Sequence, residues 1–104
     1  MKRGTTPTIT IDIPYDAVDV AACWVTFTQG GTEVMTKTLE SEGVTLTDGA
    51  ITIELTQTET LAFEASGLQQ VKMQVRIKTT DGKAVASDIT TFLAERILKE
   101  GIIE

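Results

Sequence analysis

A chain of 104 residues fits a single domain, because two domains of half that length would each be too short to sustain a hydrophobic core. Fifteen acidic against nine basic residues give a net charge of −6, which repels phosphate backbones and anionic lipid, so neither nucleic acid nor a membrane is an expected partner. The absence of histidine removes the usual general base and the commonest metal ligand, and we expect no catalytic residues, no metal and no cofactor.

Threonine is the most conspicuous feature of the composition, with nineteen residues placed mostly in alternation with aliphatic side chains. Because threonine is β-branched and half polar, it suits the solvent side of a strand. Residues 8–13 alternate strictly, and the segment ends at Pro14, which cannot donate a hydrogen bond to a sheet. This pattern predicts a first strand at a sheet edge, with Ile9, Ile11 and Ile13 facing inward.

Two strand-like segments, 20–29 and 32–39, flank a pair of glycines that is typical of a tight hairpin. Counting from a two-residue loop places Phe27 opposite Val34 and assigns every side chain to a face. The first face carries Cys23, Val25, Phe27 and Val34, and the second carries Ala22, Trp24, Met35 and Leu39. Both faces are partly apolar, so one of them is core and the other is either covered or an exposed patch.

Trp24 is the only tryptophan of the chain, and two interpretations stay open for it. As a core residue it would pack between the two sheets, which we slightly favour. As an exposed residue beside Met35 and Leu39 it would be the centre of a protein interface. These three residues are therefore interface candidates.

A second hairpin is predicted where segments 44–47 and 50–55 flank Asp48-Gly49. The count pairs Leu46 with Ile51 and Val44 with Ile53 on one apolar face. The chain then continues into the sequence Thr56-Gln57-Thr58-Glu59, whose first and last residues have the spacing of a helix capping box. We expect a single helical turn over residues 57–62 that covers one end of the sheet, closed by Gly67.

The last hairpin surrounds Thr80-Asp81-Gly82, with apolar and polar residues alternating along both strands. A two-residue loop would mix the inner and outer side chains of the two strands. A three-residue loop with Gly82 in a left-handed bulge instead places Ile77 opposite Val85 and Met73 opposite Ile89. The alternation therefore predicts the three-residue loop.

The final segment, residues 94–104, contains four large aliphatic residues, and it is compatible with a strand, a helical turn or a docking arm. Large aliphatic side chains of a free end should not remain solvated. They are therefore further interface candidates: Ile97, Leu98, Ile102 and Ile103.

About seven short strands, regular turn signals and one helical turn predict an all-β fold, an immunoglobulin-like antiparallel β-sandwich that forms a single domain over residues 1–104. The Cys…Trp…Cys spacing of true immunoglobulin domains is missing, since Cys23 is the only cysteine. A single cysteine also excludes an intramolecular disulfide and suits a reducing compartment.

Several features could carry chemistry, and each has a plainer interpretation. Asp12, Asp16 and Asp19 lie around the first loop, where calcium could bind, but their spacing matches no EF-hand and we expect a solvated loop. Cys23 has apolar strand neighbours and no histidine to activate it, which favours an inert buried thiol. No glycine-rich phosphate loop is present either, so an enzyme is not expected.

Lys72, Arg76 and Lys78 form a basic stripe along one predicted strand. The plainer interpretation is a solvated face that also guards a sheet edge against pairing with other chains. The functional interpretation is a docking site for an acidic partner, such as the acid-rich side of another copy.

Five segments of the chain resemble short proteins encoded in phages and prophages of Gram-positive gut bacteria: residues 3–8, 24–29, 55–61, 74–76 and 81–87. The resemblance extends over nearly the whole chain. These proteins are similar to the immunoglobulin-like N-terminal domains of baseplate upper proteins and tail-fibre components. The resemblance implies a β-sandwich that acts as a tail-associated structural or adaptor module, and it supplies no functional residues.

We therefore expect a non-enzymatic structural or adaptor protein of a phage-like tail or baseplate, which docks to other tail or baseplate proteins or associates with itself into a homo-oligomer. The alternative is a carbohydrate- or cell-surface-binding module, although Trp24, Tyr15 and Phe92 are few and scattered for that role. Polar residues follow the basic start of the chain where a signal peptide needs an apolar stretch. The expected site of synthesis is the bacterial cytoplasm, with incorporation into a virion as the route outward.

Overall fold

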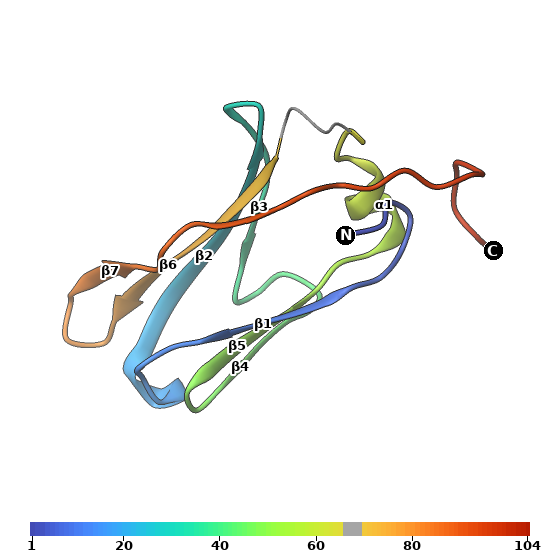
Figure 1. The fold of residues 1–104 in the computed structure, drawn as a ribbon. Helices are drawn as coiled ribbons and strands as arrows, with labels where there is room; N and C mark the ends of the chain where they lie inside the picture. Colours follow the sequence, from blue (N-terminus) through green and yellow to red (C-terminus); the bar gives the residue numbers. More distant parts are fainter. Residues whose placement is uncertain (66–69) are drawn as a thin grey trace.

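The computed structural model describes residues 1–65 and 70–104, and its strands form two antiparallel sheets around one core (Figure 1). The first sheet has the order β1-β5-β4, with β1 at Thr8–Asp12, β5 at Ala50–Glu54 and β4 at Val44–Thr47. The second has the order β3-β2-β6-β7, with β3 at Thr32–Thr38, β2 at Val20–Gln29, β6 at Val71–Thr79 and β7 at Ala84–Ala86; β8, at Thr90–Phe92, also pairs with β6. The protein is thus mainly β and sandwich-like, as predicted.

Alternate residues of β2, β5 and β6 supply the core between the sheets, because successive side chains of a strand point to opposite faces. The buried side chains of these strands include Val25, Phe27, Ile51, Ile53, Val71, Met73, Val75 and Ile77. Phe27 also packs edge-on against Phe63, which follows the helix, with 5.9 Å between the ring centroids. This contact closes the core at the end where the helix lies.

The first strand and the Asp48-Gly49 hairpin have the predicted arrangement. Strand β1 lies at the edge of its sheet, and Ile9, Ile11 and Ile13 all face the core. Across the hairpin, Val44 lies opposite Ile53 and Leu46 lies opposite Ile51. The edge position and the inward face of the first strand are confirmed, and so is the register of the hairpin.

The predicted register of the Gly30-Gly31 hairpin is wrong beyond its first pairs. A bulge at Phe27/Thr28 inserts one extra residue into β3, so Phe27 lies opposite Met35 instead of Val34. The slip moves Met35 and Leu39 to the inner face, where they pack against the core. These two interface candidates therefore do not share the outer face with Trp24.

In the last hairpin the three-residue loop is confirmed, with Gly82 at a φ of +91° and Ile77 opposite Val85. The predicted pairing of Met73 with Ile89 is wrong, because Met73 lies opposite Thr90. One extra residue is accommodated between β7 and β8, and the side chain of Ile89 is exposed as a result.

The predicted helical turn is α1, at Gln57–Leu61, and its capping box is complete. The hydroxyl of Thr56 accepts from the backbone N–H of Glu59, at 3.1 Å, and the Glu59 carboxylate accepts from the N–H of Thr56, at 2.9 Å. A short 3-10 turn, η1 at Ala17–Asp19, precedes β2. The expected closure at Gly67 lies outside the described residues.

The last residues of the chain lie beside α1 and the first residues (Figure 1). Glu95 pairs with Lys2 in a parallel bridge, and residues 96–104 form neither a strand nor a helix. Of the three alternatives for this tail, the final strand and the helical turn are therefore wrong. A docking role for the tail stays a prediction.

Candidate functional site

The outer face of the five-stranded sheet carries Trp24. On β2 the exposed Ala22 and Trp24 alternate with the buried Cys23 and Val25, so the indole points away from the core. Its exposed fraction is 53%. The structure thus decides between the two interpretations of Trp24, and the core interpretation that we favoured is wrong.

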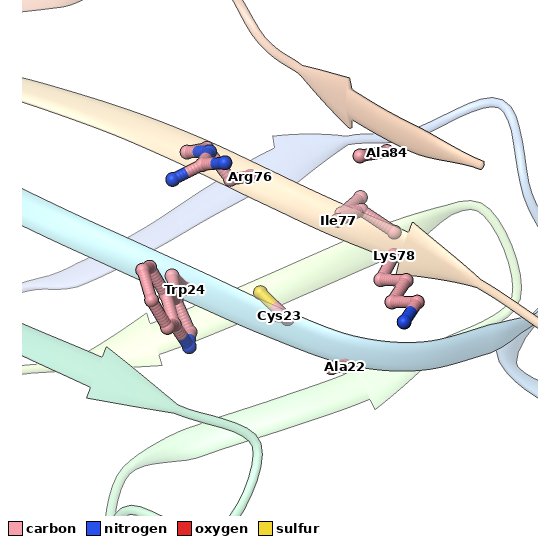
Figure 2. A pocket seen from close by; sticks show the side chains of 7 residues that line it. All are labelled: Ala22, Cys23, Trp24, Arg76, Ile77, Lys78 and Ala84. Carbon is pink, nitrogen blue, oxygen red and sulfur yellow. The ribbon is translucent and has the colours of Figure 1, made fainter. Parts of the chain in front are cut away.

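Arg76 of β6 lies directly opposite Trp24 across the β2–β6 ladder. The guanidinium carbon is 5.4 Å from the centroid of the indole ring, which is the geometry of a cation–π contact. Figure 2 shows the two side chains next to each other on neighbouring strands. At an exposed site such a contact contributes about 0.5–1 kcal/mol, so it favours the position of Arg76 over the ring.

A shallow hollow of about 220 Å³ adjoins Trp24 and Arg76 (Figure 2). Its small residues, Ala22 of β2 and Ala84 of β7, leave the space open between the larger side chains. The residues that line it are Ala22, Cys23, Trp24, Arg76, Ile77, Lys78 and Ala84. The hollow is therefore bordered by an aromatic ring and by two cationic side chains.

All three cations of the basic stripe are exposed on this same face. Their neighbours on the flanking strands are uncharged: Lys72 lies between Thr28 and Thr91, Arg76 between Trp24 and Ala86, and Lys78 between Ala22 and Ala84. Within the part of the chain that the structure describes, none of the three cations forms an ion pair. We call the surface made by these nine residues the basic face.

The interpretation of the stripe as an edge guard is wrong. Strand β6 pairs with β2 on one side and with β7 and β8 on the other, so it has no open edge to protect. The cations of the stripe therefore need another explanation, which is either simple solvation or a docking role.

The four interface candidates of the tail lie elsewhere, near α1 and the start of the chain. Ile97 is partly buried next to Gly4, whereas Leu98, Ile102 and Ile103 are exposed. The backbone here is fixed by Gln57, whose side-chain amide donates to the carbonyl of Ile103 at 3.2 Å and accepts from its N–H at 2.7 Å. The tail and Trp24 thus do not form one continuous patch.

Sequence reasoning missed an ion pair, between a buried lysine and a partly buried glutamate, that connects β3 to the capping box. The ammonium of Lys37 is 2.9 Å from a carboxylate oxygen of Glu59 and donates to the carbonyl of Glu42, also at 2.9 Å. Burial alone would raise the pKa of Glu59, but the hydrogen bonds and charge of Lys37, together with the N–H of Thr56, outweigh it and lower the pKa. The capping-box motif pointed to Glu59, but nothing in the sequence pointed to Lys37 as its partner.

Arg3 is a second polar connection that the sequence did not reveal. Its guanidinium donates to the carbonyl of Leu61, the last residue of α1, at 3.1 Å, and to that of Phe63, two residues later, at 2.6 Å. It also forms an ion pair with Glu100 of the tail. One side chain therefore connects the start of the chain, the helix and the tail, and its role is structural.

The other candidates for chemistry have structural surroundings. Cys23 is buried, as predicted, and burial raises the pKa of its thiol. Residues 1–65 and 70–104 contain no group of three or more His, Cys, Asp or Glu side chains that could hold a metal ion. Over the same residues, no helix is long and apolar enough to cross a membrane.

No family model, curated protein or solved structure matches the chain. The resemblance to phage tail-associated proteins therefore stays an expectation. The candidate site rests on the geometry of the basic face.

Proposed function

We propose that this chain is a non-enzymatic protein-docking module of a phage-like tail or baseplate. The observation that carries the docking role is the exposed Trp24, set on an open sheet face beside Arg76. Tryptophan and arginine are enriched at the energetic centres of protein interfaces, where a large side chain excludes water from a polar contact. A sheet face of this kind offers a surface for another protein without any group arranged for bond-making chemistry.

The order of the strands supports an immunoglobulin-like framework for this module. Immunoglobulin domains place strands A, B, E and D in one sheet and strands G, F and C in the other, with C′ added in variable domains. If β1 to β6 are taken as B, C, C′, D, E and F, and β7 with β8 as G, the two sheets have the orders B-E-D and C′-C-F-G. Both orders agree with that scheme, with no counterpart of strand A in the described three-stranded sheet.

The phage assignment is supported by the resemblance in sequence, and it makes a direct prediction about where the protein is found. Particles induced from the strain that carries the gene should retain the protein through a density gradient, as detected with an antibody against the chain. A marker protein of the host cytoplasm serves as the control for carry-over. Recovery of the chain with that marker, and not with the particles, would contradict the proposal.

A carbohydrate-binding module is the second candidate, and the exposed indole beside a hollow favours it, because sugar rings stack on exposed aromatic faces. Tyr15 and Phe92 pack against the core and do not extend Trp24 into an aromatic platform. A glycan array tests this candidate, with Trp24→Ala as the control for hits at the hollow. If no glycan binds in a way that depends on Trp24, the carbohydrate-binding function is excluded.

A further inference from the structure

We propose that the basic face binds an acidic segment of a partner protein, with Arg76 and Lys78 pairing with its carboxylates and Trp24 packing against its apolar atoms. The proposal rests on the docking function proposed above and adds the chemical class of the partner. It depends on three features of the face: its uncompensated charge, the spacing of its cations and the access to Trp24.

The face gathers three of the nine cations of the chain. Three of the others have carboxylate partners, Lys2 with Glu95, Arg3 with Glu100 and Lys37 with Glu59. The remaining three, Lys83, Arg96 and Lys99, form no ion pair among the described residues but do not lie together on one strand.

The three cations of the stripe lie in a protein of net charge −6, yet strands β2, β7 and β8 beside them carry no acidic residue. Asp88, in the connection between β7 and β8, is exposed and forms no ion pair with them among the described residues. Opposite charges across a ladder stabilise a sheet, so their omission here leaves positive charge available to a partner.

The spacing of the cations suits an extended segment. Side chains two residues apart on a strand point to the same face and lie roughly 6.5–7 Å apart. Arg76 and Lys78 have this separation in sequence, and Lys72 lies four residues before Arg76 on the same face. A partner segment with carboxylates on alternate residues presents the complementary spacing.

Access to Trp24 provides the apolar part of the contact. Ala22, Ala84 and Ala86 are too small to shield the indole and the neighbouring cations from a partner. A segment that covers the hollow would also exclude water from the ion pairs, which strengthens them because the local dielectric constant falls. The contact with Trp24 already favours one position of Arg76, which reduces the entropy that Arg76 loses on binding.

Charge also argues against a second copy as the occupant. A symmetric face-to-face dimer would bring the two basic stripes together, and each copy carries a net charge of −6 that opposes close approach. An acidic segment of another protein has neither problem. Head-to-tail binding of a second copy is therefore an outcome that the test must detect.

The test uses the fluorescence of Trp24, which is the only tryptophan and lies within the face. The probe is a synthetic peptide of alternating Glu and Thr, and the control peptide replaces Glu by Lys. We expect a saturable change in emission with the acidic peptide alone, and weaker binding as salt is raised. Lys78→Glu should weaken binding about tenfold or more, whereas Lys99→Glu, the same charge change on the exposed tail, should have little effect.

Arg76→Glu is a second variant, compared by affinity and not by absolute emission because it removes the cation from the ring. Circular dichroism confirms that each variant retains its sheets. The proposal is overturned if the peptide leaves the emission unchanged, or if Lys99→Glu weakens binding as much as Lys78→Glu. A change in emission with protein concentration alone, lost in Lys78→Glu, would assign the face to a second copy and overturn the acidic partner.

The same variant separates this inference from the function on which it rests. If Lys78→Glu loses the peptide but still travels with the particles, the chain docks to them through another surface and the inference about the basic face fails. If the wild-type chain binds the peptide but is absent from the particles, the phage function fails while the chemistry of the face stands.

Discussion

Lys37 shows how strongly one residue can depend on its neighbours in this protein. Its side chain is only 6% exposed, although an ammonium group is costly to remove from water. The bulge in β3 places it opposite Val25 on the inner face, and Glu59 and the carbonyl of Glu42 satisfy its charge and its donors there. The pair therefore stabilises the connection between β3 and α1 only while both partners are present.

Replacing Glu59 by glutamine isolates the charge of this pair. The amide oxygen can still accept from the N–H of Thr56, so the capping box survives, but the ammonium of Lys37 loses its counter-charge. We expect Glu59→Gln to lower the free energy of unfolding by about 1–3 kcal/mol at neutral pH. Urea denaturation measures this loss of unfolding free energy. The control is Glu40→Gln, which removes an exposed carboxylate in the turn after β3 and should stay within about 0.5 kcal/mol of the wild type.

The same variant should change the pH dependence of stability. The folded-state pKa of Glu59 is lowered from its ordinary value of 4.5, so its contribution is fully present above that value and is lost as the pH falls through the folded pKa. Wild type should therefore lose more stability than Glu59→Gln between neutral pH and pH values below 4.5. Equal losses in the two proteins would show that the ion pair does not contribute.

At the scale of the element, the sequence predicted the register of a hairpin correctly where apolar and polar residues alternate without interruption along both strands. Val44 and Leu46 face Ile53 and Ile51 across Asp48-Gly49 as counted, because each strand places its apolar residues at every second position. In β3 the adjacent Val34 and Met35 are both apolar, and the count could not tell which of them faces inward. The bulge resolves this by allowing both to pack against the core.

The candidate site was predictable in part for the same reason. The strict alternation of β6 placed Lys72, Arg76 and Lys78 on one face correctly. The contact of Arg76 with Trp24 could not be predicted, because it depends on pairing between β2 and β6, which are distant in sequence. The exposure of Trp24 could not be predicted either, because both faces of its strand carry apolar residues.

Two glycines of the connections should respond differently to the same substitution. Gly43 and Gly82 both have positive φ, at +81° and +91°, so alanine is strained at either position. A Cβ at Gly43 would also overlap the carbonyl oxygen of Glu54, whereas a Cβ at Gly82 has no other atom within 4 Å. We expect Gly82→Ala to cost about 1–2 kcal/mol and Gly43→Ala clearly more. Thermal denaturation ranks the two, and an equal loss would contradict the close approach at Gly43.

At the scale of the whole molecule, the two ends of the chain are connected through α1. Arg3 contacts two carbonyls at the end of the helix and the carboxylate of Glu100, and Gln57 holds the backbone of Ile103. Three segments that are far apart in sequence are therefore joined at one end of the sandwich. No single segment contains the information for this arrangement. Local sequence patterns therefore could not decide among a strand, a helical turn and a docking arm for the tail.

Arg3→Met should loosen this end of the molecule, because the helix carbonyls lose their donor and Glu100 loses its partner. We expect a loss of about 1–2 kcal/mol in the free energy of unfolding and faster hydrogen exchange in the tail. Arg96→Met is the matched control, since Arg96 is exposed and has no ion pair among the described residues. Similar effects of the two substitutions would contradict the structural role of Arg3.

The distribution of charge is the property of the whole molecule on which the proposed binding of an acidic partner depends. An acidic protein with one uncompensated basic face attracts acidic partners to that face and repels them elsewhere, which orients their approach. The apolar tail residues Leu98 and Ile103 lie outside this face and are not needed for such an encounter. The place where an acidic segment binds therefore distinguishes the basic face from the rest of the surface.

Nuclear magnetic resonance measures that location directly. Titration of the ¹⁵N-labelled protein with the peptide of alternating Glu and Thr should shift the single indole N–H signal of Trp24 and the backbone amides around Arg76 and Lys78. Amides of the three-stranded sheet should remain unchanged. Shifts centred on Lys83, Arg96 or Lys99, with the Trp24 signal unmoved, would show that the basic face is not the binding surface.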